Sequence, residues 1–100
     1  MNIEIVWEAE NELHESIEYY EEIEAGLGVR LKEEVRQAIQ WIRNNPLLPR
    51  IRPKGYRRVN LRAFPYYIAY FVNADTIWIL AVAHGRRSPE FWLERRKQAR

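Results

Sequence analysis

Eight basic side chains lie in the middle and near the end of the chain, and their types are suited to binding anions. They are Arg50, Arg52, Lys54, Arg57, Arg58 and Arg62, followed by Arg86 and Arg87. Such groups bind phosphates through bidentate hydrogen bonds and counterion release, and they can stabilise the charge that develops during RNA cleavage. On a sheet edge they would instead prevent aggregation and maintain solubility. The clustering tilts the interpretation slightly toward binding of a polyanion or an acidic peptide.

Aromatic and imidazole side chains accompany these basic residues. Tyr56, Phe91 and Trp92 can stack on a nucleic-acid base. His84 can transfer a proton near neutral pH, although a histidine at the end of a strand is more often a hydrogen-bonded structural residue. The candidates for binding a target or nucleic acid are therefore Arg50, Arg52, Tyr56, Arg58, Arg62, Arg86, Arg87 and Trp92.

Other kinds of site receive little support from the residue types. The chain has no cysteine, and Ser16, Ser88, His14 and His84 do not form a pattern typical of a nucleophilic enzyme. Two distant histidines and glutamates at helical spacing do not resemble a set of metal ligands, and the glutamates are interpreted as a solvated helix face. We expect neither a metal nor a cofactor.

Length and composition indicate a single domain over residues 1–100, with 47% hydrophobic and 30% charged residues. Apolar runs such as residues 77–83 are too short to span a membrane, and the first residues do not resemble a signal peptide. The expected location is the cytoplasm.

The net charge of +2 conceals a strong segregation. Residues 1–50 hold eleven Glu and five basic residues, a balance of −6, whereas residues 51–100 hold eleven basic and three acidic residues, a balance of +8. The second half is thus expected to face a polyanion or an acidic partner.

Hydrophobic periodicity predicts the elements of the first half. Apolar residues at positions 3, 5 and 7 predict a half-buried strand over residues 2–7, and spacings of three and four then predict an amphipathic helix over residues 8–24. Gly26 and Gly28 separate it from a second helix, which begins near Leu27 and is terminated by Asn44, Asn45 and Pro46. Residues 47–53 are expected to form a rigid connector.

Three strands and a short helix are predicted in the second half. Apolar residues at 59, 61 and 63 indicate one strand after Gly55, and two more follow over residues 66–72 and 76–84. Ser88 is the expected N-cap of a C-terminal helix that runs through Trp92, and the basic end beyond it suits a helix terminus or a frayed tail.

The order β-α-α-β-β-β with a short C-terminal helix predicts an α+β fold in which an antiparallel sheet packs on an αα-hairpin. The aromatic residues expected in the core are Trp7, Tyr66, Tyr67, Tyr70, Phe71 and Trp78. Tyr19, Ile23 and Trp41 fall on the flanks of the helical stripes, where they would offer a partly exposed apolar patch to a partner, or simply form the edge of the core.

Motifs along nearly the whole chain resemble the RelE/ParE superfamily of type II toxin–antitoxin toxins, especially its ParE-like branch. These motifs are Trp7-Glu8-Ala9-Glu10, Tyr19-Tyr20, Gly26-Leu27-Gly28, Asn45-Pro46, Tyr56-Arg57-Arg58, Phe64-Pro65-Tyr66 and Ala83-His84-Gly85-Arg86-Arg87 with Pro89 and Trp92. The resemblance implies a growth-inhibiting toxin of the kind linked to plasmid stabilisation, neutralised by a cognate antitoxin in a hetero-oligomer. The implied antitoxin contacts are Tyr19, Ile23, Trp41 and Arg58.

Two activities are known in the superfamily, and they imply different targets. RelE-like members cleave mRNA on the ribosome, and Lys54, Arg62, His84 and Arg86 are the catalytic candidates if this chain does the same. Phe91-Trp92 replaces the tyrosine typical of that site, and neither side chain transfers a proton from oxygen. Because the His-Gly-Arg-Arg ending is more usual in ParE-like members, which inhibit DNA gyrase, the resemblance favours a gyrase inhibitor over a ribonuclease.

Overall fold

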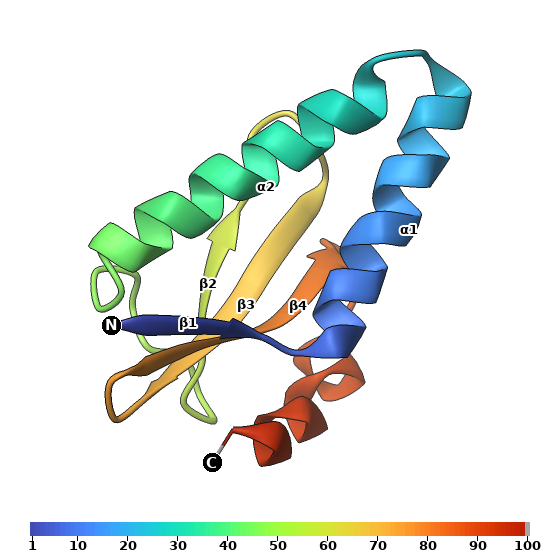
Figure 1. The fold of residues 1–100 in the computed structure, drawn as a ribbon. Helices are drawn as coiled ribbons and strands as arrows, with labels where there is room; N and C mark the ends of the chain where they lie inside the picture. The colour runs from blue at the N-terminus through green and yellow to red at the C-terminus, as the bar shows by residue number, and fades with distance from the viewer. Residues whose placement is uncertain (100) are drawn as a thin grey trace.

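The computed structural model describes residues 1–99 as one four-stranded sheet with two helices packed on one of its faces (Figure 1). The elements are β1 (Asn2–Ile5), α1 (Trp7–Ile23), α2 (Leu27–Asn44), β2 (Arg57–Asn60), β3 (Tyr66–Asn73) and β4 (Thr76–His84), followed by two short 3-10 helices, η1 (Pro89–Phe91) and η2 (Leu93–Gln98). The predicted α+β class and element order are confirmed. No helix within residues 1–99 is long and apolar enough to cross a membrane.

The strand order in the sheet is β1-β4-β3-β2, which places β1 and β2 at its two edges. The predicted antiparallel meander of β2, β3 and β4 is confirmed. However, β1 pairs parallel with β4, so the sheet is mixed rather than wholly antiparallel. Parallel neighbours require a long connection. Residues 6–75 lie between these two strands, so the hydrophobic pattern of either strand alone does not reveal their relative direction.

The start of the chain differs from its predicted alternation. The strand ends at Ile5, and Val6 rather than Trp7 enters the core, with its backbone N–H donating to the Ile79 carbonyl at 3.1 Å. Trp7 begins α1 and is 67% exposed. Because the chain changes from strand to helix one residue earlier than expected, Val6 and Trp7 exchange sides, and the prediction of a packed Trp7 is wrong.

The predicted αα-hairpin is confirmed, and Glu21 joins its two helices. The Glu21 carboxylate accepts hydrogen bonds from the backbone N–H groups of Gly26, at 2.8 Å, and Gly28, at 2.9 Å. At Gly28 the helices approach so closely that a Cβ atom would lie 2.4 Å from the Ile17 carbonyl oxygen. Glu21 therefore satisfies free N–H groups at the start of α2, and it is not simply part of a solvated face.

The C-terminal segment forms the two short 3-10 helices and is bound to the rest of the molecule. Strand β1 pairs with β4 only as far as Ile79. Beyond that point the Leu80 carbonyl accepts a hydrogen bond from Arg95 at 3.0 Å, and the Val82 N–H donates to Glu12 at 3.2 Å. Arg95 and Glu12 also form an ion pair at 2.9 Å. This pair takes the place of the missing strand neighbour. Of the two alternatives predicted for the basic end, the described residues show the helix terminus and not the frayed tail.

The core lies between the helices and the sheet, and a second buried layer covers part of the sheet's other face. Leu31, Val35 and Ile42 of α2 belong to the first layer. Tyr67 points to the opposite face, which we call the outer face, because side chains alternate along a strand. There Trp92, which is 1% exposed, donates a hydrogen bond to the Tyr67 hydroxyl at 2.7 Å.

Candidate functional site

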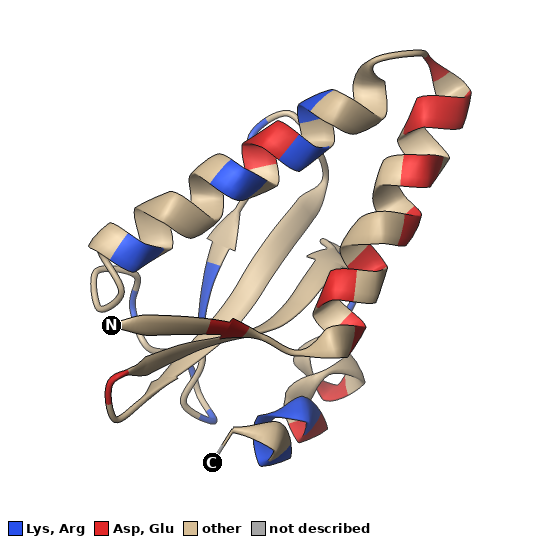
Figure 2. Ribbon diagram, in the orientation of Figure 1, with Lys and Arg blue, Asp and Glu red and all other residues tan. Residues whose placement is uncertain are grey.

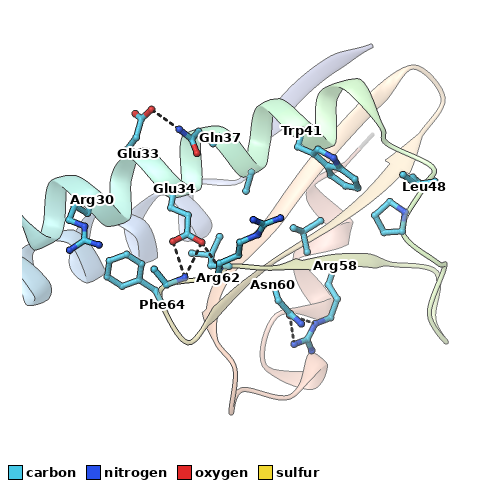
Figure 3. Close-up of a pocket in the computed structure, with 15 residues that line it drawn as sticks. Arg30, Glu33, Glu34, Gln37, Trp41, Leu48, Arg58, Asn60, Arg62 and Phe64 are labelled. Carbon is cyan, nitrogen blue, oxygen red and sulfur yellow. Dashed lines mark hydrogen bonds between the residues drawn. The ribbon is translucent and has the colours of Figure 1, made fainter.

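A groove of about 1030 Å³ runs between α2 and the edge strand β2 (Figure 3). It is positioned by the second helix on one side, by β2 and the turn that follows it on the other, and by the proline-containing connector at one end. Its residues come from three segments of the chain, within residues 30–41, 48–49 and 58–64. The groove has an apolar end, an unpaired strand edge and a charged end.

The apolar end is formed by Trp41 and Leu48, which are 40% and 70% exposed. Trp41 lies on the last turns of α2, and Leu48 follows Pro46 in the connector, where the chain cannot continue the helix. Leu47 and Ile51 of the connector are also exposed, although they do not line the groove. Exposed apolar side chains gathered in a groove are typical of a surface that binds another protein.

The strand edge is open over a short length. The Leu61 N–H donates to the Tyr66 carbonyl on β3, and the backbone groups of alternate strand residues point in opposite directions, so those of Arg58 and Asn60 point away from β3. On that open side, no other residue among 1–99 forms a backbone hydrogen bond with either of them. The preceding outward carbonyl, that of Tyr56, accepts a hydrogen bond from the Arg52 N–H at 2.8 Å.

The charged end is organised by Glu34 of α2. Its carboxylate accepts hydrogen bonds from the backbone N–H of Arg62 and from that of Ala63, the latter at 3.2 and 3.3 Å from its two oxygens. The exposed arginines Arg30 and Arg62 line the groove beside it. Within residues 1–99 neither guanidinium forms an ion pair or a side-chain hydrogen bond.

Several of the predicted target-binding residues lie on or near the outer face of the sheet. The Arg58 guanidinium lies 4.0 Å above the centre of the Tyr67 ring and donates to the Asn60 side chain at 2.8 Å, on the side of β2 away from α2 (Figure 3). The Tyr67 hydroxyl donates to the Arg87 carbonyl at 2.8 Å, and the Arg87 guanidinium lies 4.3 Å above the exposed ring of Phe91. Basic and aromatic groups thus alternate here.

The other predicted target-binding residues differ in their exposure. Arg50 and Arg86 are exposed, whereas Arg52 is half-buried in the connector. Tyr56 and Trp92 are buried against each other edge-to-face, with ring centres 4.8 Å apart. Because neither ring has a free face, the prediction that these two stack on a base is wrong, and Phe91 is the exposed aromatic residue near the basic groups.

The four candidates for RNA cleavage lie in different surroundings. Arg62 lines the large groove, and His84 lines a smaller cleft of about 260 Å³ beside Glu12 and Arg87, whereas Lys54 and Arg86 line neither. The His84 Nδ1 atom accepts the Arg86 N–H at 3.1 Å, and its ring lies 5.6 Å from that of Tyr66. His84 is therefore in the surroundings of a hydrogen-bonded structural residue, which is one of the two interpretations of its sequence position. The described residues contain no group of three or more side chains that could hold a metal.

The predicted antitoxin contacts fall into two pairs. Trp41 and Arg58 line the groove, whereas Tyr19 and Ile23 are exposed farther along α1 and do not line it. Sequence reasoning missed Glu34 and Leu48. Glu34 contacts residues 28 and 29 positions away, and a contact at that separation leaves no periodic signal in one sequence.

Comparison with known proteins agrees with this fold and identifies the family. A solved structure described as the chromosomal ParDE TA system from P. aeruginosa matches with a TM-score of 0.65 over 84% of this chain and 95% of that chain, at 16% identity, which shows the fold alone. The profile of the family described as "ParE toxin of type II toxin-antitoxin system, parDE" matches residues 3–89. The chain therefore belongs to the ParE toxin family.

Curated relatives match a shorter stretch. Toxin ParE2 of Mycobacterium tuberculosis, in strains H37Rv and CDC 1551, is 50% identical over 36 residues, which is 36% of this chain and 34% of that protein. The match thus spans about a third of each relative.

Proposed function

We propose that this protein is a toxin that inhibits DNA gyrase and that a cognate antitoxin neutralises it by occupying the groove between α2 and β2. One observation supports the proposed antitoxin site. In this member of the ParE family, exposed Trp41 and Leu48 lie beside an open strand edge. A partner segment that pairs with β2 would satisfy its free backbone groups, and its side chains would cover the apolar end.

The outer face is the proposed surface for gyrase or gyrase-bound DNA. Arg58 lies there against the Tyr67 ring. Arg87 lies against Phe91 at the smaller cleft beside α1, and Arg86 is exposed in the adjacent turn. Arginine held against an aromatic ring loses little further entropy when it binds a phosphate or a carboxylate. Cleavage of mRNA is not favoured, because the matching family is that of ParE toxins and because the four candidate residues are not gathered in one site.

The direct test is purified gyrase with relaxed plasmid DNA. We expect the protein to inhibit supercoiling or to trap cleaved DNA, and we expect Arg86→Gln with Arg87→Gln to weaken the effect. The matched control is the double variant Arg36→Gln with Arg43→Gln. It removes the same amount of charge from exposed positions on α2. Absence of both effects with protein in excess over enzyme would refute gyrase as the target, and new mRNA ends in a toe-printing assay on programmed ribosomes would support the alternative.

Antitoxin docking is tested by co-expression with a cognate antitoxin. Trp41→Lys places a charge in the groove and should abolish protection from the toxin and co-purification of the two chains. Tyr19→Lys makes the same change at an exposed aromatic residue outside the groove and should leave both intact. The reverse outcome would move the antitoxin site to the surface of α1.

A further inference from the structure

We propose that the charged end of the groove is a binding site for a carboxylate, which Glu34 occupies in the free protein and which a partner segment fills with a carboxylate of its own. This inference rests on the proposed function for the identity of the partner, a segment of the antitoxin. It adds the chemistry of that segment: extended, apolar where it meets Trp41, and acidic at the end that reaches Arg62.

The backbone supplies the site. The N–H groups of Arg62 and Ala63 are consecutive and both point at one carboxylate, which is an anion-binding arrangement of main-chain amides (Figure 3). Such arrangements recognise side-chain carboxylates and chain termini in other complexes. The carboxylate bound here belongs to Glu34, which reaches across from α2.

The surrounding charges favour an additional carboxylate. Arg30 and Arg62 line the groove beside Glu34 and form no ion pair within residues 1–99. The neighbouring acid, Glu33, is already paired with Arg36 at 2.6 Å. A carboxylate that takes the place of Glu34 at the amides would therefore lie beside Arg62, which forms no ion pair, and Glu34 could turn toward Arg30 or toward solvent as it leaves.

The strand edge determines where that carboxylate falls along the partner. The outward backbone groups of β2 are those of Arg58 and Asn60, and the next outward N–H is that of Arg62, about two residues or 7 Å farther along an extended chain. In a longer paired strand a partner carbonyl would accept this N–H. Glu34 takes the place of that carbonyl, so a segment paired with Arg58 and Asn60 either ends there or displaces Glu34.

The experiment is amide NMR of the labelled protein with three peptides that share one alternating Val-Thr body. One is amidated and ends in glutamate, one ends in glutamine with a free terminal carboxylate, and one is amidated and ends in glutamine. We expect at least one of the first two to shift the Arg62 and Ala63 amide signals and to bind roughly tenfold more tightly than the neutral peptide, and which of them does so identifies the source of the carboxylate.

Two variants test whether Glu34 competes with the peptide. Glu34→Ala should tighten binding of the acidic peptide several-fold, because the amides are then unoccupied, whereas Glu33→Ala removes one carboxylate from the adjacent residue and should not. Equal binding of acidic and neutral peptides to the wild-type protein would overturn the proposal. So would an unchanged affinity in a folded Glu34→Ala variant. If that variant does not fold, the wild-type comparison still decides.

The same measurements separate this inference from the proposed function. Selective binding of the acidic peptide together with a negative gyrase assay would retain the carboxylate site and reject the gyrase target. Gyrase inhibition with no preference for an acidic peptide would do the opposite.

Discussion

The ion pair between Glu12 and Arg95 closes the part of β4 that β1 leaves without a neighbour, so its loss should lower the free energy of unfolding substantially. Arg95 donates to both Glu12 oxygens, at 3.0 and 2.9 Å, and to the Leu80 carbonyl. The perturbation that tests this is Arg95→Met, which keeps an apolar side chain of similar length and removes the charge and every donor. Glu12 would then keep only its hydrogen bond from Val82.

The size of the expected loss of stability follows from the exposure of the two side chains. The Arg95 and Glu12 side chains are 13% and 20% exposed, which places the pair nearer to the buried than to the surface class. Breaking a buried pair costs about 3–5 kcal/mol, whereas exposed pairs contribute roughly 0–1 kcal/mol. We expect about 2–3 kcal/mol for Arg95→Met, or a fall in Tm of roughly 10–20 °C for a domain of this size. Adding Glu12→Gln should restore part of that loss, because the residual charge is removed.

The assay is urea unfolding followed by tryptophan fluorescence, with Arg36→Met as the control. Arg36 pairs with Glu33 at 2.6 Å on the exposed side of α2, so its loss should leave the midpoint unchanged within error. If the two variants are equally stable, or if adding Glu12→Gln further destabilises Arg95→Met, the pair does not support the edge of β4 as described.

Three further predictions concern stability. Gly28→Ala should lower the free energy of unfolding by about 1–3 kcal/mol in thermal unfolding, because its Cβ would lie 2.4 Å from the Ile17 carbonyl oxygen; a wild-type Tm would refute this. Burial raises the pKa of Tyr70 from 10.0 to about 12, so the unfolded chain loses the phenol proton first as pH rises. Stability should therefore fall between about pH 10 and 12, and less so in Tyr70→Phe, as measured by urea midpoints across that range. Trp92→Phe should cost about 1–2 kcal/mol in urea unfolding, since it leaves the Tyr67 hydroxyl without its 2.7 Å donor.

Much of the fold could be predicted because hydrophobic periodicity reports local structure. The change of period near the first helix, the glycines between the helices and the turn before β4 each act within a few residues. The parallel pairing of β1 could not be predicted in this way, since it joins residues more than 70 positions apart. Trp7 was misplaced because a shift of one residue at a strand end reverses the side-chain direction.

The candidate site was predictable only in part. Arg58 and Trp41 were identified because charged and aromatic residues beside apolar patterns are visible in one sequence. Glu34 and Leu48 were missed, because their roles depend on where α2 and the connector lie against β2. Tyr56 and Trp92 have the right chemistry for stacking, but the sequence does not show that each covers the other.

The segregation of charge along the chain also has a different meaning in three dimensions. Acidic residues recur along the length of α1 (Figure 2). Yet three glutamates of the first half bind backbone N–H groups, namely Glu12 at Val82, Glu21 at the start of α2 and Glu34 at Arg62. The acidic half thus holds the ends of strands and helices in place and is more than a solvated face. Glu12 is fixed by Arg95, and Glu21 is held between closely packed helices. Glu34 lies in an open groove beside unpaired arginines, so of these three contacts it is the one at which a partner's carboxylate can compete.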